Sequence, residues 1–307
     1  MTNLSGLLAA ACAFILWGVL PAYWKTLQEV PAYEILCHRM SWSLLLTLGL
    51  VFITGRRVIF RQALRERKNL ITFAATGLLL AVNWLLYIWA VNAGFIVEAS
   101  LGYFINPLIN VLFGMVFFRE KMRPVQWLAL LFAFLGVLYL TIYYGRFPWI
   151  ALVLATSFAT YGLLHKKNHL GALDGLCLET GILFLPAIAV LAGLAYTGAG
   201  SFGHIGLSGS LLLAGTGVVT TVPLLFFGYA AQKIPLSTLG LMQYLAPTIN
   251  LILGVCIYGE EFPRARLIGF ILIWGALGIY MTENIIRRLH NRKKVLTRSE
   301  SNGTVYE

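Results

Sequence analysis

Residues 101–120 read LGYFINPLINVLFGMVFFRE, and residues 241–260 read LMQYLAPTINLILGVCIYGE. The two segments share the pattern Pro-x-x-Asn-x-x-x-Gly, together with flanking residues, at a constant offset of 140. The recurring residues are Leu101, Pro107, Ile109, Asn110, Gly114 and Glu120, which return as Leu241, Pro247, Ile249, Asn250, Gly254 and Glu260. Self-similarity at a fixed spacing is typical of internal duplication. We therefore expect a chain built from two related halves.

Both segments are almost entirely apolar, and so is most of the chain around them. Hydrophobic residues make up 59% of the 307 residues and charged residues 11%, whereas soluble domains contain roughly 45–50% apolar residues. The mean hydropathy is +0.80. Apolar runs of about 20 residues, the length that crosses about 30 Å of hydrocarbon, predict ten membrane spans. The expected spans are 4–24, 33–54, 70–92, 97–118, 125–144, 148–164, 175–196, 208–231, 236–258 and 266–283. The sequence therefore predicts an all-α polytopic membrane protein.

Basic residues are distributed unevenly between the segments that connect these spans. If the N-terminus is cytoplasmic, 18 of the 23 Lys and Arg fall on the cytoplasmic side: six in 55–69, three in 119–123, two in 166–167, Lys233, and six after residue 284. The outer side then has four, namely Lys25, Arg146, Arg264 and Arg266, and Arg39 lies within a span. Because an excess of Lys and Arg marks the cytoplasmic face, we expect both termini in the cytoplasm.

The two similar segments lie in the fourth and ninth expected spans, which cross the membrane in opposite directions. The halves 1–145 and 146–284 are therefore expected to form an inverted repeat of five helices each, followed by a basic tail at 285–307. Inverted repeats are typical of secondary transporters, whose sites lie at the repeat interface.

Charge and motif content argue against several functional classes. The net charge of +11 lies in short segments beside membrane helices and not in a separate basic domain, which disfavours nucleic-acid binding. Motifs of zinc proteases, serine hydrolases and P-loop nucleotide-binding proteins are absent. The four cysteines lie inside expected spans without metal-ligand spacing. We expect neither a metal nor a cofactor.

Ionisable side chains inside expected spans are candidates for a functional site, because they are costly in hydrocarbon. Arg39 lies about 10 Å inside the outer end of the second span, and Glu98 is the carboxylate at nearest depth. We expect these two to pair, either as a site for a substrate anion or as a structural ion pair that orients helices. Glu34 and His38 are spaced i, i+4 and are able to share a proton, although a solvated position for Glu34 near the interface is an equal alternative.

Glu179 lies near the cytoplasmic end of the seventh span without a basic neighbour. It either binds a proton during transport or is buried for structural reasons against Thr180 or Tyr161. The candidates for proton coupling are thus Glu34, Glu98 and Glu179. The remaining histidines, His165, His169, His204 and His290, are expected to be solvated in loops or the tail.

Polar and aromatic side chains in the spans predict a central cavity. Tyr103, Asn106, Pro107 and Asn110 form one stripe on the fourth span, and Gln243, Pro247 and Asn250 are its counterpart in the ninth. These groups either line a cavity at the membrane midplane or hold helices together by hydrogen bonds. The aromatic residues assigned to the same cavity are Trp17, Trp42, Trp84 and Tyr87, and the remaining tryptophans are expected to be interfacial anchors.

At these residues the sequence resembles the RarD subgroup of EamA-type permeases, in the drug/metabolite transporter superfamily. The matching stretches are LWG at 16–18, EILCHR at 34–39, NW at 83–84, EASLGYFINP at 98–107 and LSTLGLMQYLAPT at 236–248. The resemblance implies two inverted five-helix halves, a bacterial inner-membrane location and export of small metabolites or drugs. It also suggests protons as a coupling ion, because small multidrug relatives use a membrane glutamate for proton exchange.

The sequence thus predicts a secondary transporter that moves a small organic molecule by alternating access and without ATP, with the solute and membrane lipid as its partners. The alternative is an intramembrane enzyme or lipid-handling protein that uses the Arg39 and Glu98 region. Such enzymes usually group several carboxylates or histidines in adjacent loops, and this chain has no such group. A channel or receptor fits the inverted repeat less well.

Overall fold

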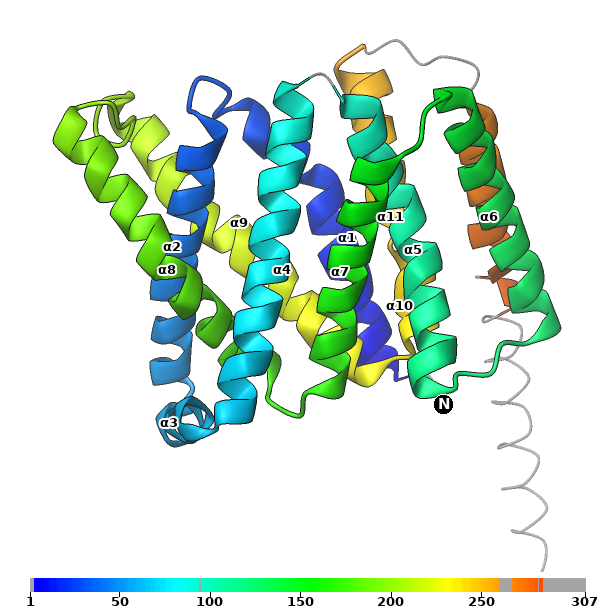
Figure 1. The fold of residues 1–307 in the computed structure, drawn as a ribbon, viewed down its shortest axis with the longest axis horizontal. Helices are drawn as coiled ribbons and strands as arrows, with labels where there is room; N and C mark the ends of the chain where they lie inside the picture. Colours follow the sequence, from blue (N-terminus) through cyan, green and yellow to red (C-terminus); the bar gives the residue numbers. More distant parts are fainter. Residues whose placement is uncertain (1–2, 94, 260–266, 281, 284–307) are drawn as a thin grey trace, which may run out of the picture. The chain divides into compact units, whose positions relative to one another are not determined.

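A computed structural model describes residues 3–93, 95–259, 267–280 and 282–283, and every regular element in these ranges is helical (Figure 1). The elements are α1 (Leu4–Lys25), α2 (Ala32–Ile53), α3 (Arg57–Arg65), α4 (Arg67–Asn92), α5 (Ile96–Phe118), α6 (Pro124–Tyr144), α7 (Trp149–Lys167), α8 (Ala172–Thr197), α9 (Gly206–Lys233), α10 (Leu236–Met242), α11 (Leu245–Ile252), the π-helix η1 (Leu253–Ile257) and a final helix, Leu267–Tyr280. Glu260, Arg264, Arg266, His290 and the basic residues of the tail lie outside the described residues.

Eight of these segments are long and apolar enough to cross a membrane: α1, α2, α4, α5, α6, α8, α9 and Leu236–Ile257. They coincide with eight of the ten expected spans. Helices also occupy the other two positions, α7 and Leu267–Tyr280, but the first is less apolar and the second is shorter over its described residues. Polar residues in the middle of α7, such as Ser157 and Thr160, lower its hydropathy. The chain is therefore a multi-pass membrane protein.

The chain divides into two compact units. The larger contains Met1–Glu120 and Tyr144–Glu261, and the smaller contains Lys121–Tyr143 and Phe262–Glu307. In the smaller unit, Gly136 of α6 packs against Gly269, Leu272 and Ile273 of the final helix, and Arg123 forms an ion pair with Glu283.

Within the larger unit, helices that are far apart in the sequence pack side by side (Figure 1). Helix α5 contacts α7 and α10, α2 contacts α8 and α9, and α1 contacts α9 and α11. At Gly240 of α10, an added Cβ would lie 2.7 Å from the carbonyl oxygen of Pro107 and 2.8 Å from Asn110 Cβ in α5. Only a glycine permits this approach, as is common where membrane helices meet.

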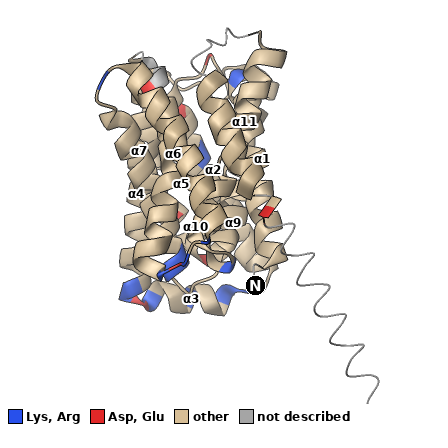
Figure 2. Cartoon of the chain, turned by 90° about the vertical axis from the view of Figure 1, so that its right-hand side faces the viewer, with Lys and Arg blue, Asp and Glu red and all other residues tan. Residues whose placement is uncertain are grey.

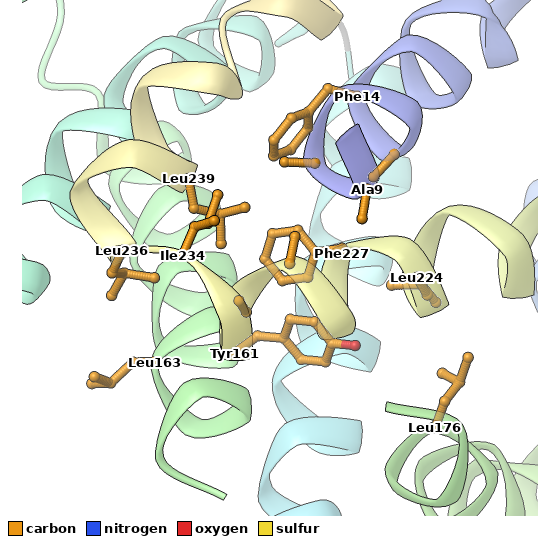
Figure 3. Close-up of a cluster of buried hydrophobic side chains, with 14 of the residues drawn as sticks. Ala9, Phe14, Tyr161, Leu163, Leu176, Leu224, Phe227, Ile234, Leu236 and Leu239 are labelled. Atoms are coloured by element: carbon orange, nitrogen blue, oxygen red, sulfur yellow. The ribbon is translucent and has the colours of Figure 1, made fainter. Parts of the chain in front are cut away.

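Aromatic side chains fill the centre of the larger unit (Figure 3). Phe14, Tyr161 and Phe227 are at most 1% exposed. The ring of Phe227 lies 5.8 Å from that of Tyr161 and 6.2 Å from that of Phe14, and Trp17 and Phe158 pack against the same cluster. Buried aromatic pairs contribute about 0.5–1.5 kcal/mol beyond the area they bury. This cluster therefore stabilises α1, α7 and α9 against one another.

The expected span 236–258 is divided into three helical pieces. The α-helix is interrupted at Gln243 and Tyr244, resumes in α11, and continues as η1. Pro247 lies in the first turn of α11, where a missing N–H is tolerated. Pro107 instead lies inside the continuous helix α5. At the interruption, Gln243 Oε1 accepts a hydrogen bond from Asn110 Nδ2 of α5 at 2.6 Å.

Basic residues of the larger unit gather around α3 and the neighbouring helix ends (Figure 2). Helix α3, which the sequence analysis treated only as a basic connection, is strongly amphipathic. An open groove lined by Ile59 of α3, Lys68 of α4 and Lys167 of α7 shows that these ends lie together. The connection of α9 to α10 is at the same end, because Lys166 Nζ hydrogen-bonds to the carbonyl oxygen of Ile234 at 2.5 Å.

Candidate functional site

A cavity of about 210 Å³ lies inside the larger unit. Its walls come from α1, α2, α4, α5, α7 and the segment Gln243–Asn250. Eight of the residues assigned to a substrate site from the sequence line it: Trp17, Arg39, Trp84, Tyr87, Tyr103, Asn106, Gln243 and Asn250. The structure thus brings together residues from both copies of the repeated segment.

Arg39 of α2 provides the positive charge of this cavity. Its guanidinium carbon lies 4.0 Å from the ring centre of Trp84 and 4.9 Å from that of Trp24, so two indoles attract it through cation–π interactions. Its Nε donates a hydrogen bond to Thr220 Oγ1 at 2.9 Å. Among the described residues, no carboxylate lies within ion-pair distance of Arg39, and neither terminal nitrogen has a hydrogen-bond acceptor. The bidentate edge of the guanidinium is therefore free to bind an anion.

The expected pairing of Arg39 with Glu98 is wrong. Glu98 is 2% exposed, and its carboxylate accepts a hydrogen bond from the backbone N–H of Ile150 at 2.7 Å and another from Tyr144 Oη at 2.8 Å. Ile150 lies in the first turn of α7, where N–H groups lack partners within the helix and a negative charge is favoured. Arg39 and Glu98 were expected at similar depth in the membrane, but the side chain of Glu98 does not point toward Arg39. It stabilises the start of α7 instead.

Amide side chains connect the walls of the cavity. Asn106 Nδ2 donates to the carbonyl oxygen of Ala155 at 3.0 Å, and Asn110 Nδ2 donates to Asn106 Oδ1 at 2.7 Å and Gln243 Oε1 at 2.6 Å. Asn110 is fully buried behind the wall and does not line the cavity. Asn250 does line it, and its Oδ1 is buried without a hydrogen-bond partner in the described part of the chain.

Two further residues assigned to the site, His38 and Trp42, lie outside the cavity lining. Trp42 Nε1 donates to His38 Nδ1 at 3.3 Å, and the His38 ring lies 5.1 Å from that of Phe202. The two residues therefore belong to the packing between α2 and the connection that precedes α9.

Glu34 is adjacent to His38, as its i, i+4 spacing predicted, at 3.8 Å. A solvated position for Glu34 is wrong, because the residue is 1% exposed. Its carboxylate accepts hydrogen bonds from Ser201 N at 2.6 Å, Ser201 Oγ at 2.9 Å and Phe202 N at 3.4 Å. The carboxylate thus accepts hydrogen bonds that this part of the loop between α8 and α9 would otherwise donate to water.

Glu179 and His165 form a buried pair that the sequence analysis did not anticipate. Glu179 is 0% exposed and His165 is 2% exposed, so a solvated His165 is wrong. His165 Nε2 lies 2.8 Å from Glu179 Oε1, and Tyr161 Oη donates to Glu179 Oε2 at 3.3 Å. His169 and His204 are exposed, as expected. Helix α7 continues three residues beyond the expected span end at 164, which carries His165 into the bundle.

Three residues in or beside the cavity were not predicted from the sequence as site residues. Trp24 was expected to be an interfacial anchor because it lies near a helix end, but its ring packs over Arg39. Asn83 lines the cavity and donates to the carbonyl oxygen of Leu154 at 2.8 Å and to Ser157 Oγ at 2.9 Å. Thr220 is one of several threonines in α9, and nothing in the sequence distinguishes it from Thr216 or Thr221.

Comparisons with known proteins agree with a membrane transporter. The model of the EamA-like transporter family matches residues 4–142 and 148–282. Protein RarD of Streptomyces exfoliatus is 48% identical over 276 residues, which cover 90% of this chain and 87% of that protein. A Bacillus subtilis (strain 168) protein named uncharacterized transporter YojE is 39% identical over 284 residues, covering 90% and 93%. A solved crystal structure with 20% identity has the same fold, with a TM-score of 0.67 over 90% of this chain and 96% of that chain.

Proposed function

This chain belongs to the EamA-like transporter family, and we propose that it is a secondary transporter that carries a small organic anion across the membrane by alternating access. The resemblance to the RarD subgroup is confirmed by relatives of that name at 41–48% identity over about 90% of the chain. Membrane transport follows from the family. The proposal concerns the kind of solute, the mechanism of transport and its direction.

The observation that carries the proposal is Arg39 with a free bidentate edge on a cavity lined by aromatic residues. An arginine inside a membrane protein is costly unless it has a partner, and the described residues supply one hydrogen bond and two aromatic faces but no negative charge. A carboxylate or phosphate on the solute would supply it with matching geometry. Arg39 is thus a binding residue for an anion.

The size of the cavity limits the solute. Its volume of about 210 Å³ is below the roughly 300–1,000 Å³ of pockets that enclose drug-sized ligands. Trp17, Trp84 and Tyr87 offer apolar faces, and Asn106, Gln243 and Asn250 offer amide groups. These walls fit a small metabolite with an apolar body and a few polar substituents better than a large drug.

The proposal includes ten spans in two inverted halves and both termini in the cytoplasm. The repeated segments and the match of the family model to two successive stretches support the duplication. The 18 to 4 distribution of basic residues supports the orientation, as does the gathering of the described ones around α3. The resemblance supports export across a bacterial inner membrane.

No observation favours the enzyme or lipid-handling alternative. That alternative placed Arg39 and Glu98 in one site, but both oxygens of Glu98 are bound at the start of α7. The relatives compared above bear the names of transporters or of RarD proteins.

The test measures solute release from proteoliposomes loaded with an isotope-labelled mixture of small carboxylates, phosphate esters, amines and neutral solutes. Wild-type protein should release one or a few anionic members faster than protein-free liposomes. Arg39→Ala should slow that release at least about 30-fold, because loss of a desolvated charge partner costs about 2 kcal/mol or more. Arg146→Ala, which removes an exposed arginine, should release them normally. Release of no member, or of amines and neutral solutes only, would contradict the proposal.

A further inference from the structure

The buried acidic residues of the larger unit differ in the kind of hydrogen-bond donors that they meet. Glu34 accepts from the backbone N–H groups of Ser201 and Phe202, and Glu98 accepts from that of Ile150. Glu120 accepts from the N–H groups of Leu236 and Ser237 at the start of α10, at 2.7 and 2.9 Å. A backbone N–H can only donate, so each of these carboxylates is needed as a hydrogen-bond acceptor.

Among the residues that the structure describes, Glu179 meets only groups that can either donate or accept a hydrogen bond. The imidazole of His165 and the hydroxyl of Tyr161 both have this property. The hydrogen bond between the Glu179 carboxyl group and the His165 imidazole therefore persists both before and after the pair takes up one proton. Of the three acids that the sequence offered for proton coupling, only Glu179 has surroundings that accommodate a change of protonation.

Few charges reach this pair from the helices packed around it. Helix α4 contributes Phe73 and Gly77, and α9 contributes Gly228. On α8 itself, Asp174 lies more than one turn away, and its charge is offset by Arg56, whose pKa is raised by their hydrogen bond. On α7, the ammonium of Lys166 is directed to the carbonyl oxygen of Ile234 and to Glu120. The charge of Asp174 is thus offset by Arg56, and the charge of Lys166 is directed to groups other than His165 and Glu179.

The pair is connected to the cavity through one helix and one ring stack. Phe158 lines the cavity, its ring stacks on Tyr161 at 5.6 Å, and Tyr161 binds Glu179. His165 lies about two turns beyond Phe158 on the same helix, α7. A movement of α7 that opens the cavity would therefore also change the burial of the pair.

We propose that His165 and Glu179 form the proton-binding site of this protein. In the deprotonated pair, His165 Nε2–H donates to the Glu179 carboxylate and the net charge is −1. On uptake of one proton, the imidazole passes its Nε2 proton to the carboxylate as the new proton binds Nδ1, which leaves a neutral carboxyl group beside a neutral imidazole and brings the net charge to zero. A net charge is disfavoured in this buried position, so the closed pair holds its proton and releases it when water reaches the site. The role of this exchange in transport rests on the proposed function.

The test uses infrared difference spectra of the full-length protein against pH, in nanodiscs of phosphatidylethanolamine and phosphatidylglycerol. Wild-type protein should show the carbonyl stretch of one buried carboxyl group that gains and loses a proton. Glu179→Gln should remove this band. His165→Gln should move its titration midpoint by about one pH unit or more, as expected for directly coupled groups. The matched control Glu98→Gln removes a carboxylate that is equally buried and should leave the band unchanged.

Tyr161→Phe keeps the ring stack and removes only the hydroxyl, so it provides a second variant if Glu179→Gln does not fold. It should shift the frequency of the band, because the carboxyl group loses a hydrogen bond. A band that is missing from the wild type, that survives Glu179→Gln, that disappears in Glu98→Gln, or that ignores both His165→Gln and Tyr161→Phe would overturn the inference. Proton uptake without release of any solute from proteoliposomes would instead support the proton-binding site and contradict the proposed transport function.

Discussion

Asn110 and Asn250 occupy equivalent positions in the two repeated segments but have different surroundings. Asn110 is fully buried, and its Nδ2 joins Asn106 to Gln243 between α5 and α10. The Oδ1 atoms of both asparagines lack a hydrogen-bond donor within the described residues, but only Asn250 lines the cavity. A buried acceptor without a donor costs about 1–3 kcal/mol, and a bound solute would remove that cost. One asparagine therefore holds helices together and the other is available to the solute.

The two alanine substitutions should consequently separate stability from transport. Asn110→Ala should lower the free energy of unfolding by about 1–3 kcal/mol, because Gln243 Oε1 and Asn106 Oδ1 lose a donor. Asn250→Ala should leave the melting temperature in detergent near that of the wild type and slow the release of the transported solute. Equal losses of thermal stability in both variants would show that both amides are structural.

At the scale of helices, the contact between α5 and α10 depends on the absence of a side chain at Gly240. The Cβ of an alanine would lie 2.7 Å from a backbone oxygen, the carbonyl of Pro107, which cannot move aside as a flexible side chain would. The same contact is supported by the hydrogen bond from Tyr244 Oη to the carbonyl oxygen of Phe104 at 3.0 Å. Since both repeated segments meet here, this contact sets the shape of the cavity wall.

Gly240→Ala should therefore destabilise the protein by about 1–3 kcal/mol, the usual cost of overpacking. Gly49→Ala in α2 is the matched control, because no heavy atom lies within 4 Å of its added Cβ. That control should be neutral or slightly stabilising, since alanine favours helix by up to about 1 kcal/mol over glycine. Thermal unfolding of the two purified variants would check this, and a Gly240→Ala variant as stable as Gly49→Ala would refute the close contact.

Hydropathy was sufficient to predict the eight segments of the described chain that are long and apolar enough to cross a membrane, because membrane thickness fixes span length. It did not predict the short amphipathic helix α3. Polar and aromatic positions on apolar helices selected eight of the residues that line the cavity, because such side chains turn inward. The sequence could not predict which neighbouring helix the Glu98 side chain faces, or that α7 continues far enough to bury His165. Both depend on the N–H groups and side chains of other helices. The interruption near Gln243 was also missed: Pro247 was recognised, but its effect depends on where the helix restarts.

For the whole molecule, two features of its larger unit bear on transport. One is the cavity with Arg39, and the other is the separate pair of His165 and Glu179 on the same helix bundle. In alternating access, a solute site faces one side of the membrane at a time, so bound solute on one side can exchange for solute on the other. A channel does not couple the two fluxes.

Counterflow in proteoliposomes tests whether the protein is an alternating-access carrier of anions. Proteoliposomes containing the wild-type protein are filled with the unlabelled mixture of carboxylates, phosphate esters, amines and neutral solutes at high concentration, and the same mixture, labelled, is added outside at low concentration. A labelled anion should transiently accumulate inside above its external concentration. Arg39→Lys should reduce this accumulation, and Arg39→Ala should abolish it while Arg146→Ala should not. Simple equilibration of the label without transient accumulation, or accumulation that is unchanged in Arg39→Ala, would show that the protein is not a carrier that binds anions at Arg39.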